Sequence, residues 1–323
     1  MKIYDVAFLG MGASALATAK LKYKGTSISL IGIDKNYHSK RNNFFAFWLT
    51  DWMKDFDSLA QKKWFCWNFY LTNNHIKHET KDLPYCTIRY QDWKNYCLKG
   101  LENLSIKEFN VQSITNLKKY YEIKLENGEE IFAKKIYDSR TPKLENEKVK
   151  QHFFGYLIET KQMINSNSVT LMDFRVEQKM GLHFMYCLPI DENRMLVEST
   201  VFSSEIQEDA WYQKQILEYI ETKLNLSEYK IVDEEKGALP MYDIENKSSE
   251  NYINIGSRGG ATKISTGYAF SFFLKNIMLN FENINKAHHS YFDKWMDKVF
   301  VNYLKNNSGT EKVFINMAYS LNG

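Results

Sequence analysis

Cysteine and proline are scarce in this sequence, with four of each among 323 residues. The cysteines, Cys66, Cys86, Cys97 and Cys187, are widely spaced and form no C-x-x-C pair. This spacing argues against a disulfide scaffold and against a cysteine-ligated zinc site. We therefore interpret them as free thiols in a reducing compartment.

Long apolar runs and a strong net charge are also lacking. The longest apolar candidates, such as Ile264 to Leu274, are shorter than the ~18 residues that a transmembrane helix needs. The apolar stretch Val6 to Ala19 imitates a signal peptide, but Asp5 and a single preceding lysine argue against that interpretation. The net charge of +3 excludes an obvious nucleic-acid binder, and 44% hydrophobic residues exclude a disordered chain.

Aromatic residues, in contrast, are abundant. They make up 15% of the chain, a proportion that suits a large apolar ligand. Two aromatic strings, residues 44–48 and 64–70, fit either a hydrophobic core or the lining of such a ligand site. The length is about twice the ~150 residues of one typical domain, so we expect two domains or one elaborated domain.

The first thirty-four residues have the pattern of a dinucleotide-binding unit. A β-rich run, Ile3 to Leu9, is followed by a glycine turn, a helix-forming stretch to about Lys24, and a second apolar run, Ile28 to Ile33. Gly10 permits the tight turn, Gly12 lets the backbone approach a pyrophosphate, and Ala15 takes the helix-packing position. Ala13 and Ser14 open the helix, whose N-terminal N–H groups favour phosphate. Asp34, 24 residues after Gly10, has the spacing of a ribose-binding acid.

The rest of the chain alternates between helical and strand-like patterns. An Asn127-Gly128 turn between residues 120–125 and 130–137 predicts a hairpin. Three further strand-like runs, residues 169–178, 182–190 and 194–202, predict an antiparallel meander. Helices are predicted over residues 52–64, 91–104, 208–224, 268–281 and 290–306. The fold class is therefore α/β, a Rossmann-type domain with a second, mostly antiparallel β-sheet domain, and the polar segment 141–150 is a suitable connector.

Several stretches together resemble one family, the flavin-dependent lycopene cyclases, whose fold is similar to that of p-hydroxybenzoate-hydroxylase-type flavoproteins. The stretches that carry the resemblance are DVAFLGMGASALA from Asp5, IYDSR from Ile136, QHFFGYLIET from Gln151, VTLMDFRVEQ from Val169, LHFMYCLPIDENRMLVEST from Leu182, EEKGALP from Glu234 and INIGSRGGATKISTGYAFSFFL from Ile253.

This resemblance implies FAD as the cofactor, active in its reduced form, with NAD(P)H as the reductant. Gly10, Gly12 and Asp34 would then contact the ADP half. The resemblance also implies that Asp138 and the segment containing Gly256, Gly259 and Gly260 approach the rest of the cofactor, and that Thr266-Gly267 opens the following helix. The FAD-binding domain would be discontinuous, comprising residues 1–60, 85–145 and 235–323, with a substrate domain of residues 61–84 and 146–234.

Glu198 is the candidate catalytic acid. Leu196, Glu198 and Thr200 share one face of a strand, which surrounds the carboxyl with apolar neighbours and would raise its pKa. A solvated strand face or a salt bridge is the structural alternative. Under the resemblance Glu198 is the first acid of an E-[DE]-T motif, whose second acid is here Ser199.

The reaction implied by the family is non-redox cyclisation of a linear carotene, an intramolecular lyase or isomerase activity of the lycopene beta-cyclase type. A proton adds to the terminal double bond, the neighbouring alkene captures the cation, and a proton is lost from the ring. Reduced FAD would stabilise the cation or deliver the proton.

Two other functions stay open: a flavin-dependent monooxygenase of an apolar substrate, and a non-catalytic isoprenoid- or lipid-binding flavoprotein. The halogenase W-x-W-x-I-P signature is absent, and Asp138-Ser139 stands where hydroxylases have Asp-Gly. No metal site is expected: His75 and His78 are interpreted as part of a polar loop, and His288-His289 as a surface pair.

A carotene or another large apolar molecule would reach the protein from a bilayer. We therefore expect a cytoplasmic protein that is peripheral on the inner face of the cell membrane. The segment Lys40 to Phe45, in which basic residues precede two phenylalanines, is the predicted contact.

Overall fold

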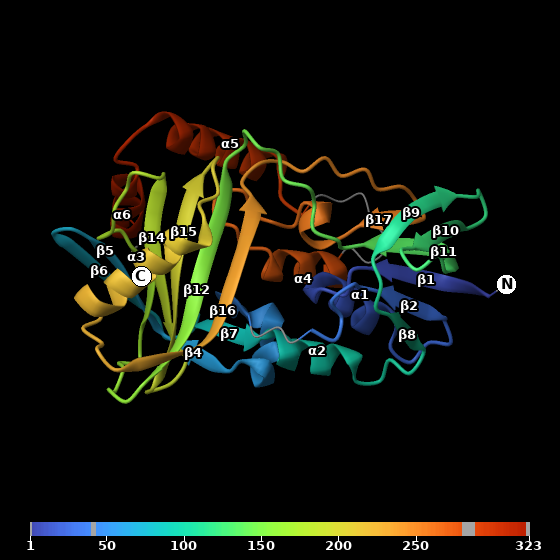
Figure 1. Ribbon diagram of the computed structural model, residues 1–323, viewed down its shortest axis with the longest axis horizontal. Helices are drawn as coiled ribbons and strands as arrows, with labels where there is room; N and C mark the ends of the chain where they lie inside the picture. The colour runs from blue at the N-terminus through green and yellow to red at the C-terminus, as the bar shows by residue number, and fades with distance from the viewer. Residues whose placement is uncertain (1, 40–42, 280–287, 321–323) are drawn as a thin grey trace. The chain divides into compact units, whose positions relative to one another are not determined.

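The computed structural model describes residues 2–39, 43–279 and 288–320. The chain forms two compact units, each assembled from three stretches of sequence (Figure 1). The first unit comprises residues 1–41, 90–143 and 243–295, and the second comprises residues 42–89, 144–242 and 296–323. The predicted connector, residues 141–150, contains one of the boundaries between them.

The predicted domain limits differ from these units at several edges. Residues 42–60, 85–89, 144–145, 235–242 and 296–323 are predicted in the first domain but belong to the second unit. The reasons are pairing and packing: strand β3 (Phe44–Trp48) pairs with β7 (Tyr85–Arg89), and strand β16 (Tyr229–Pro240) pairs with β12 (Lys150–Thr160) through its last residue. Helix α6 (Glu311–Ser320) packs on β5 (Cys66–Leu71) and β6 (Asn74–Glu79).

The first unit contains a mostly parallel sheet in the order β8-β2-β1-β11-β10-β9, with β17 beside β11. β8, β2, β1, β11 and β17 run parallel. β10 runs in the opposite direction, and β9, which is antiparallel to β10, runs in the direction of β11 again. The predicted parallel βαβ unit and the predicted hairpin are both confirmed. The bounds of its elements are β1 Ile3–Leu9, α1 Ala13–Tyr23, β2 Leu30–Ile33, α2 Tyr90–Leu98, β8 Leu104–Lys107, β9 Val111–Asn116, β10 Tyr121–Leu125, β11 Glu130–Asp138, β17 Tyr252–Asn254, the 3₁₀ helix η2 Gly256–Gly259 and α4 Phe270–Leu279.

The second unit contains a seven-stranded sheet in the order β16-β12-β15-β14-β13-β5-β6. All its neighbours are antiparallel except β13 and β5, so the predicted mostly antiparallel sheet and its meander β13-β14-β15 are confirmed. A smaller sheet has the order β3-β7-β4. The remaining bounds are the 3₁₀ helix η1 Asp51–Leu59, β4 Lys62–Trp64, β13 Val169–Asp173, β14 Leu182–Pro189, β15 Arg194–Ser203, α3 Asp209–Thr222 and α5 Tyr291–Asn306, which crosses the boundary between the units.

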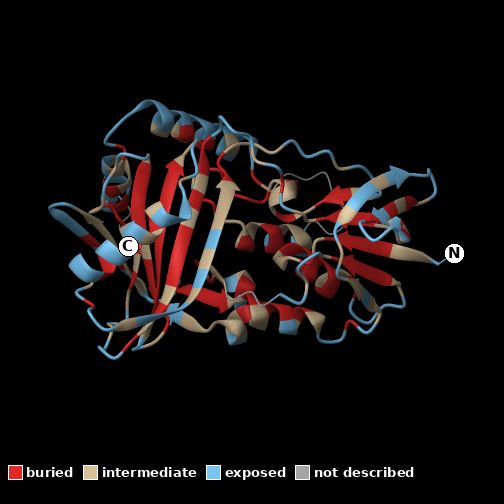
Figure 2. Ribbon diagram, in the orientation of Figure 1, coloured by how far each residue is buried: buried red, intermediate tan, exposed pale blue. Residues whose placement is uncertain are grey.

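Each unit has its own core. In the first, alternate residues of β1 and β2, such as Leu9 and Ile33, pack with the hairpin β10-β11. In the second, α3 packs against the face of β12 and β15 that carries Phe154 and Val197. Figure 2 shows β14 and β15 buried along most of their length, whereas the edge strand β16 has exposed stretches. Because side chains alternate along a strand, the opposite face of β15 carries Glu198.

Two helix predictions were too long. The predicted helix at residues 52–64 is the 3₁₀ helix η1 followed by β4, because residues 62–64 pair with β7. The predicted helix at 91–104 ends at Leu98, where Gly100 has a φ of +82° that stops the helix, and β8 begins at Leu104.

Both histidine pairs differ from their predicted settings. His75 and His78 lie in strand β6 and not in a loop, and the buried His78 Nε2 hydrogen-bonds the Ala318 carbonyl at 3.0 Å. His289 is buried and its Nε2 lies 3.2 Å from the Ala261 carbonyl, so the pair is not a surface pair. Burial lowers the pKa of His288 to about 4.

Candidate functional site

The turn after β1 requires glycine at position 10. Gly10 has a φ of +78°, and its N–H donates to the Ile33 carbonyl at 2.8 Å, which joins the ends of β1 and β2. A Cβ on this residue would lie 3.0 Å from Ser139 Oγ and 3.3 Å from the Arg140 nitrogen. Only glycine combines this conformation with this close approach.

Gly12 is the N-cap of α1, in an extended conformation that any residue can adopt, and no side chain of the described residues caps the helix. A Cβ at Gly12 would have nothing within 4 Å among the described residues. Ala13, Ser14 and Ala15 form the first turn, with Ala15 fully buried as its packing position predicts. A helix start without a side-chain cap leaves backbone N–H groups for an anionic ligand.

Asp34 follows β2 and holds the glycine turn in place. One carboxylate oxygen accepts from the Met11 N–H at 2.8 Å, and the other accepts from the Asn36 N–H at 2.9 Å. Each carboxylate oxygen has a further lone pair, so these bonds are compatible with the predicted ribose contact.

Two residues of α2, which the sequence analysis did not single out, also fix this turn. The Tyr90 hydroxyl donates to the Met11 carbonyl and the Trp93 indole N–H donates to the Ala13 carbonyl, each at 3.1 Å. Their spacing of three residues puts both on one face of the helix. That spacing was the only sign of this role in the sequence, and it does not indicate that the two side chains bond the glycine turn.

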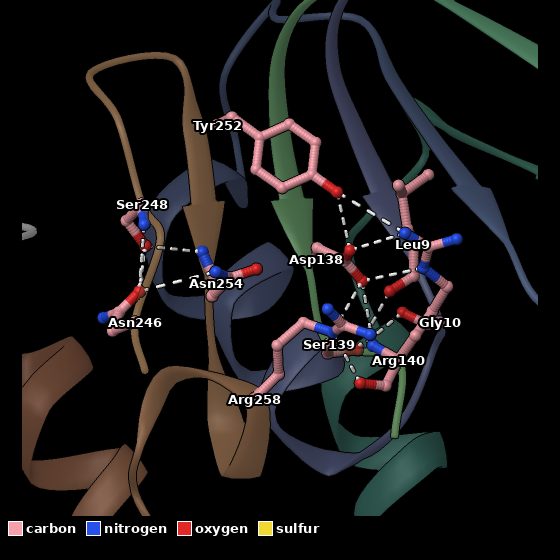
Figure 3. A network of polar contacts seen from close by, with 10 residues as sticks. All are labelled: Leu9, Gly10, Asp138, Ser139, Arg140, Asn246, Ser248, Tyr252, Asn254 and Arg258. Carbon is pink, nitrogen blue, oxygen red and sulfur yellow. Dashed lines mark hydrogen bonds and ion pairs between the residues drawn. The ribbon is translucent and has the colours of Figure 1, made fainter. Parts of the chain in front are cut away.

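Asp138, at the end of β11, is the centre of an ion-pair network (Figure 3). Its fully buried carboxylate accepts from Arg140 Nε at 2.9 Å, from Arg140 Nη2 at 2.7 Å and from the Tyr252 hydroxyl at 2.7 Å. Arg258 Nε lies 3.5 Å from the same carboxylate. Burial opposes the charge, but Arg140 and Tyr252 outweigh it and hold the pKa of Asp138 below its usual range. Asp138 therefore orients the two arginines, which are the groups of this network that a ligand could meet.

The glycine-rich segment after β17 packs against the start of α1. Gly256 has a φ of +61°, and a Cβ there would clash with Ser14 Oγ. A Cβ at Gly259 would lie 2.5 Å from the Asn254 carbonyl oxygen, whereas one at Gly260 would have nothing within 4 Å among the described residues. The structure thus brings two of the predicted cofactor segments together. Asn254 adds a buried side-chain oxygen with no hydrogen-bond partner in the described part of the chain.

Thr266 and Gly267 do not open a helix directly, as was expected. Both N–H groups donate to the Lys263 carbonyl, at 3.2 and 2.8 Å, and the helix α4 begins only at Phe270. Gly267 has a φ of +73°, so the pair forms a separate turn before the helix.

Glu198 lies in the middle of β15, opposite Gly155 of β12 and Tyr186 of β14. It is 8% exposed, and the Thr200 hydroxyl donates to its carboxyl at 2.5 Å. Burial, followed by the nearby Glu235 carboxyl, raises the pKa of Glu198 well above its usual value. The predicted desolvated acid is therefore present, and Glu198 holds a proton at a pH where an ordinary glutamate is charged.

Ser199 points to the other face, as strand alternation predicts. Its hydroxyl, fully buried, hydrogen-bonds His183 Nε2 at 2.9 Å, and His183 Nδ1 lies 2.9 Å from the Glu177 carbonyl. Burial lowers the pKa of His183 to about 4, so the ring is neutral. An acid at position 199 would contact His183 and not the Glu198 face.

The fold and the candidate site together define the structural class of the protein. A Rossmann-type unit with an uncapped helix after its glycine turn, joined in one chain to a mostly antiparallel sheet, is the architecture of FAD-binding flavoproteins. A sequence model of the family described as lycopene cyclase protein matches residues 5–296, and the chain belongs to this family.

Individual relatives are more distant. Neoxanthin synthase, chloroplastic, from Solanum tuberosum is 23% identical over 298 residues, which cover 82% of this chain and 57% of that protein. The chain thus spans little more than half the length of this curated relative.

Among solved structures, a geranylgeranyl bacteriochlorophyll reductase-like protein from Thermoplasma acidophilum is similar with a TM-score of 0.67 and 11% identity, over 99% of this chain and 89% of that one. A variant of halogenase PltM in complex with FAD has a TM-score of 0.60 and 10% identity, over 98% and 73%. The flavin-dependent brominase Bmp2 has a TM-score of 0.57 and 12% identity, over 98% and 84%. These likenesses establish the flavoprotein fold.

Proposed function

We propose that the first unit binds FAD and that the second unit binds the substrate. The residues fit this cofactor: the uncapped start of α1 and the open space at Gly12 suit a pyrophosphate, and Asp34 suits a ribose. Gly256 packs against Ser14 at that helix start. Gly259, Gly260 and Asn254, whose side-chain oxygen has no partner among the described residues, belong to the same segment and would extend this surface. Reduced FAD, when bound, would supply negative charge that stabilises a cation, with NAD(P)H as the proposed reductant.

We propose that the reaction is the cyclisation of the end of a linear carotene, without net oxidation or reduction. The observation that carries this proposal is the buried, proton-holding Glu198 in a chain of the lycopene cyclase family. In the acid form Glu198 can donate its proton to a terminal double bond. The next double bond then attacks the tertiary cation, a ring forms, and loss of a ring proton completes the isomerisation. The Thr200 hydroxyl, which bonds the Glu198 carboxyl, would hold it in one orientation.

Replacing Glu198 by glutamine tests this role. Glu198→Gln preserves the shape of the side chain but removes the transferable proton, and the loss should cost on the order of 3 kcal/mol of barrier, about a hundredfold in rate. Cyclic carotene formed in the presence of reduced FAD is the measurement. Glu234→Gln is the matched control, because Glu234 is an exposed acid on β16 of the same sheet. Full cyclase activity in Glu198→Gln would contradict the mechanism.

A flavin-dependent monooxygenase is the second candidate, favoured by the structural similarity to a brominase and a halogenase. Oxygen-dependent consumption of NAD(P)H with an apolar substrate would support it. A flavoprotein that retains an isoprenoid without turnover is the third candidate. A bound carotenoid that is recovered unchanged after incubation with reduced FAD would support that function.

We also propose that the protein contacts a membrane surface and works on the cytoplasmic side. No helix in the described residues is long and apolar enough to span a bilayer. The predicted contact at Lys40 to Phe45 lies partly outside the described residues, and Phe44 and Phe45 are half-buried in β3. Helix α5 supports the proposal better: Tyr291, Phe292, Trp295, Met296, Val299 and Tyr303 are between 44% and 89% exposed.

A further inference from the structure

Gly155 separates two acids that come from different strands. β12 lies between β15 and β16, and Gly155 is opposite Glu198 on one side and Glu235 on the other. A Cβ on Gly155 would lie 3.4 Å from Glu198 Cβ and 3.4 Å from Glu235 Cγ. The same Cβ would lie 3.3 Å from Leu196 Cδ1, so a larger residue than glycine would be crowded here. The two acids therefore project from the same face of the sheet, on either side of Gly155.

This face is the one opposite helix α3. The α3 face of β12 carries Phe154 and Tyr156, which pack in the core of the second unit, and Gly155 points away from them. On the Gly155 face, the backbone N–H of Phe44 in β3 donates to the Glu235 carboxyl. Glu235 thus lies on the same face of the sheet as Glu198, with contributions from β12, β15, β16 and β3.

The groups around the pair come from several strands. Glu198 receives the Thr200 hydroxyl from its own strand, and Tyr186 is its neighbour on β14. Glu235 has Asp233 on its own strand, and Arg89 is opposite Phe44 on β7. Burial, opposed by the Phe44 N–H and reinforced by Asp233, raises the pKa of Glu235 to about 7. Two like charges this close in a buried setting repel, so the pair retains a proton at neutral pH.

We propose that Glu235 is a positioning residue for Glu198: it faces Glu198 across Gly155 and, as a second acid on that face, favours the protonated form of Glu198. This inference rests on the proposed function for its chemical meaning, but the coupling of the two carboxyls is a property of the protein alone. EEKGALP, the stretch in which Glu235 lies, was noted in the sequence only as part of the family resemblance.

The first test is an infrared titration of the substrate-free protein, which follows the C=O absorption of protonated carboxyl groups against pH. Glu235→Gln removes the repulsion, so the midpoint for Glu198 should fall by about one pH unit, a tenfold change in its proton affinity. Glu234→Gln, the exposed neighbour, should leave the Glu198 midpoint in place. An unshifted Glu198 midpoint in Glu235→Gln would overturn the proposal.

The second test is the pH profile of cyclase activity. An essential acid form gives a rate that falls as pH rises through its midpoint. Glu235→Gln should move this falling limb to lower pH by the shift seen in the infrared titration, whereas a merely structural defect would lower the rate at every pH. A parent protein without cyclase activity would contradict the proposed function and leave the infrared result standing. A shift in activity without one in the titration would contradict the coupling.

Discussion

Glycine is present at positions 10 and 12 for different physical reasons, and single substitutions can test the difference. Gly10 is required by the fold itself, since its φ is +78° and its Cα faces Ser139 and Arg140. Gly12 has an ordinary backbone conformation and open space where a side chain would start. The chain alone gives no reason for glycine at position 12, which is what a ligand-contacting position predicts.

Gly12→Val should therefore leave the protein folded but weaken flavin binding at least tenfold, about 1.4 kcal/mol, because the side chain occupies the proposed pyrophosphate approach. Flavin retained after gel filtration and the dissociation constant from fluorescence quenching are the measurements, with thermal unfolding as the check on folding. Gly10→Val is the matched comparison and should lose stability as well as flavin. If Gly12→Val binds flavin as tightly as the parent, the assignment of this site is wrong.

At the scale of elements, helix α5 combines exposed aromatic residues with lysines. Phe292, Trp295 and Tyr303 are 66%, 51% and 44% exposed, and Lys298 and Lys305 are exposed on the same helix. Tyrosine and tryptophan suit the interface of a bilayer, and lysines are attracted to anionic lipid. An anionic membrane surface is therefore the occupant that this helix face suits.

The double variant Phe292→Ser/Trp295→Ser should reduce binding to vesicles that contain phosphatidylglycerol, because it removes two interfacial side chains from one helix face. Flotation at low salt measures the bound fraction, and we expect a several-fold reduction. Met163→Ser removes a side chain that is 77% exposed outside α5 and should have no effect. A parent protein that stays wholly in the soluble fraction would rule out this role for α5.

For the whole molecule, buried ionisable groups set opposing pH limits on stability. The raised pKa values of Glu198 and Glu235 mean that the folded state binds protons more tightly than the unfolded state. Their stabilising contribution is fully present below the unfolded pKa of 4.5. That of Glu235 is lost as pH rises towards about 7, and that of Glu198 is lost as pH rises through its own raised folded pKa. The buried His152 and His183, whose pKa values burial lowers to about 4, act in the opposite sense. Their contribution to the stability of the folded state is present above pH 6.5, the unfolded pKa of histidine, and is lost as pH falls towards 4.

A comparison of variants separates the two effects. Glu198→Gln removes the carboxyl that must ionise at high pH, so its melting temperature relative to the parent should rise between pH 5 and pH 8. Thermal unfolding followed by circular dichroism at several pH values measures this difference, and Glu234→Gln should show none. A difference that is constant with pH would mean that Glu198 has the same pKa in the folded and unfolded states.

The local sequence determined those elements that depend only on neighbouring residues. The strand, glycine turn, helix and acid from Ile3 to Asp34 could be predicted because backbone conformation and spacing specify them. The hairpin at Asn127-Gly128 and the meander of β13 to β15 followed from turn chemistry and alternation. Alternation also placed Glu198 and Ser199 on opposite faces.

The tertiary structure decided those strand pairings and side-chain contacts whose partners lie far apart in the sequence. Residues 62–64 look helical but pair with β7, and β12 and β16 became recognisable as strands only through their neighbours in the sheet. The bonds of the Asp138 carboxylate to Arg140 and Tyr252 likewise depend on the tertiary structure, because Tyr252 lies on β17, far along the chain. Glu235 lies 37 residues from Glu198 in the sequence, and only the register of β12 with both strands brings the two acids together across Gly155. The register of strand pairing and the burial of a residue depend on contacts with residues distant in the sequence, so no local pattern encodes them.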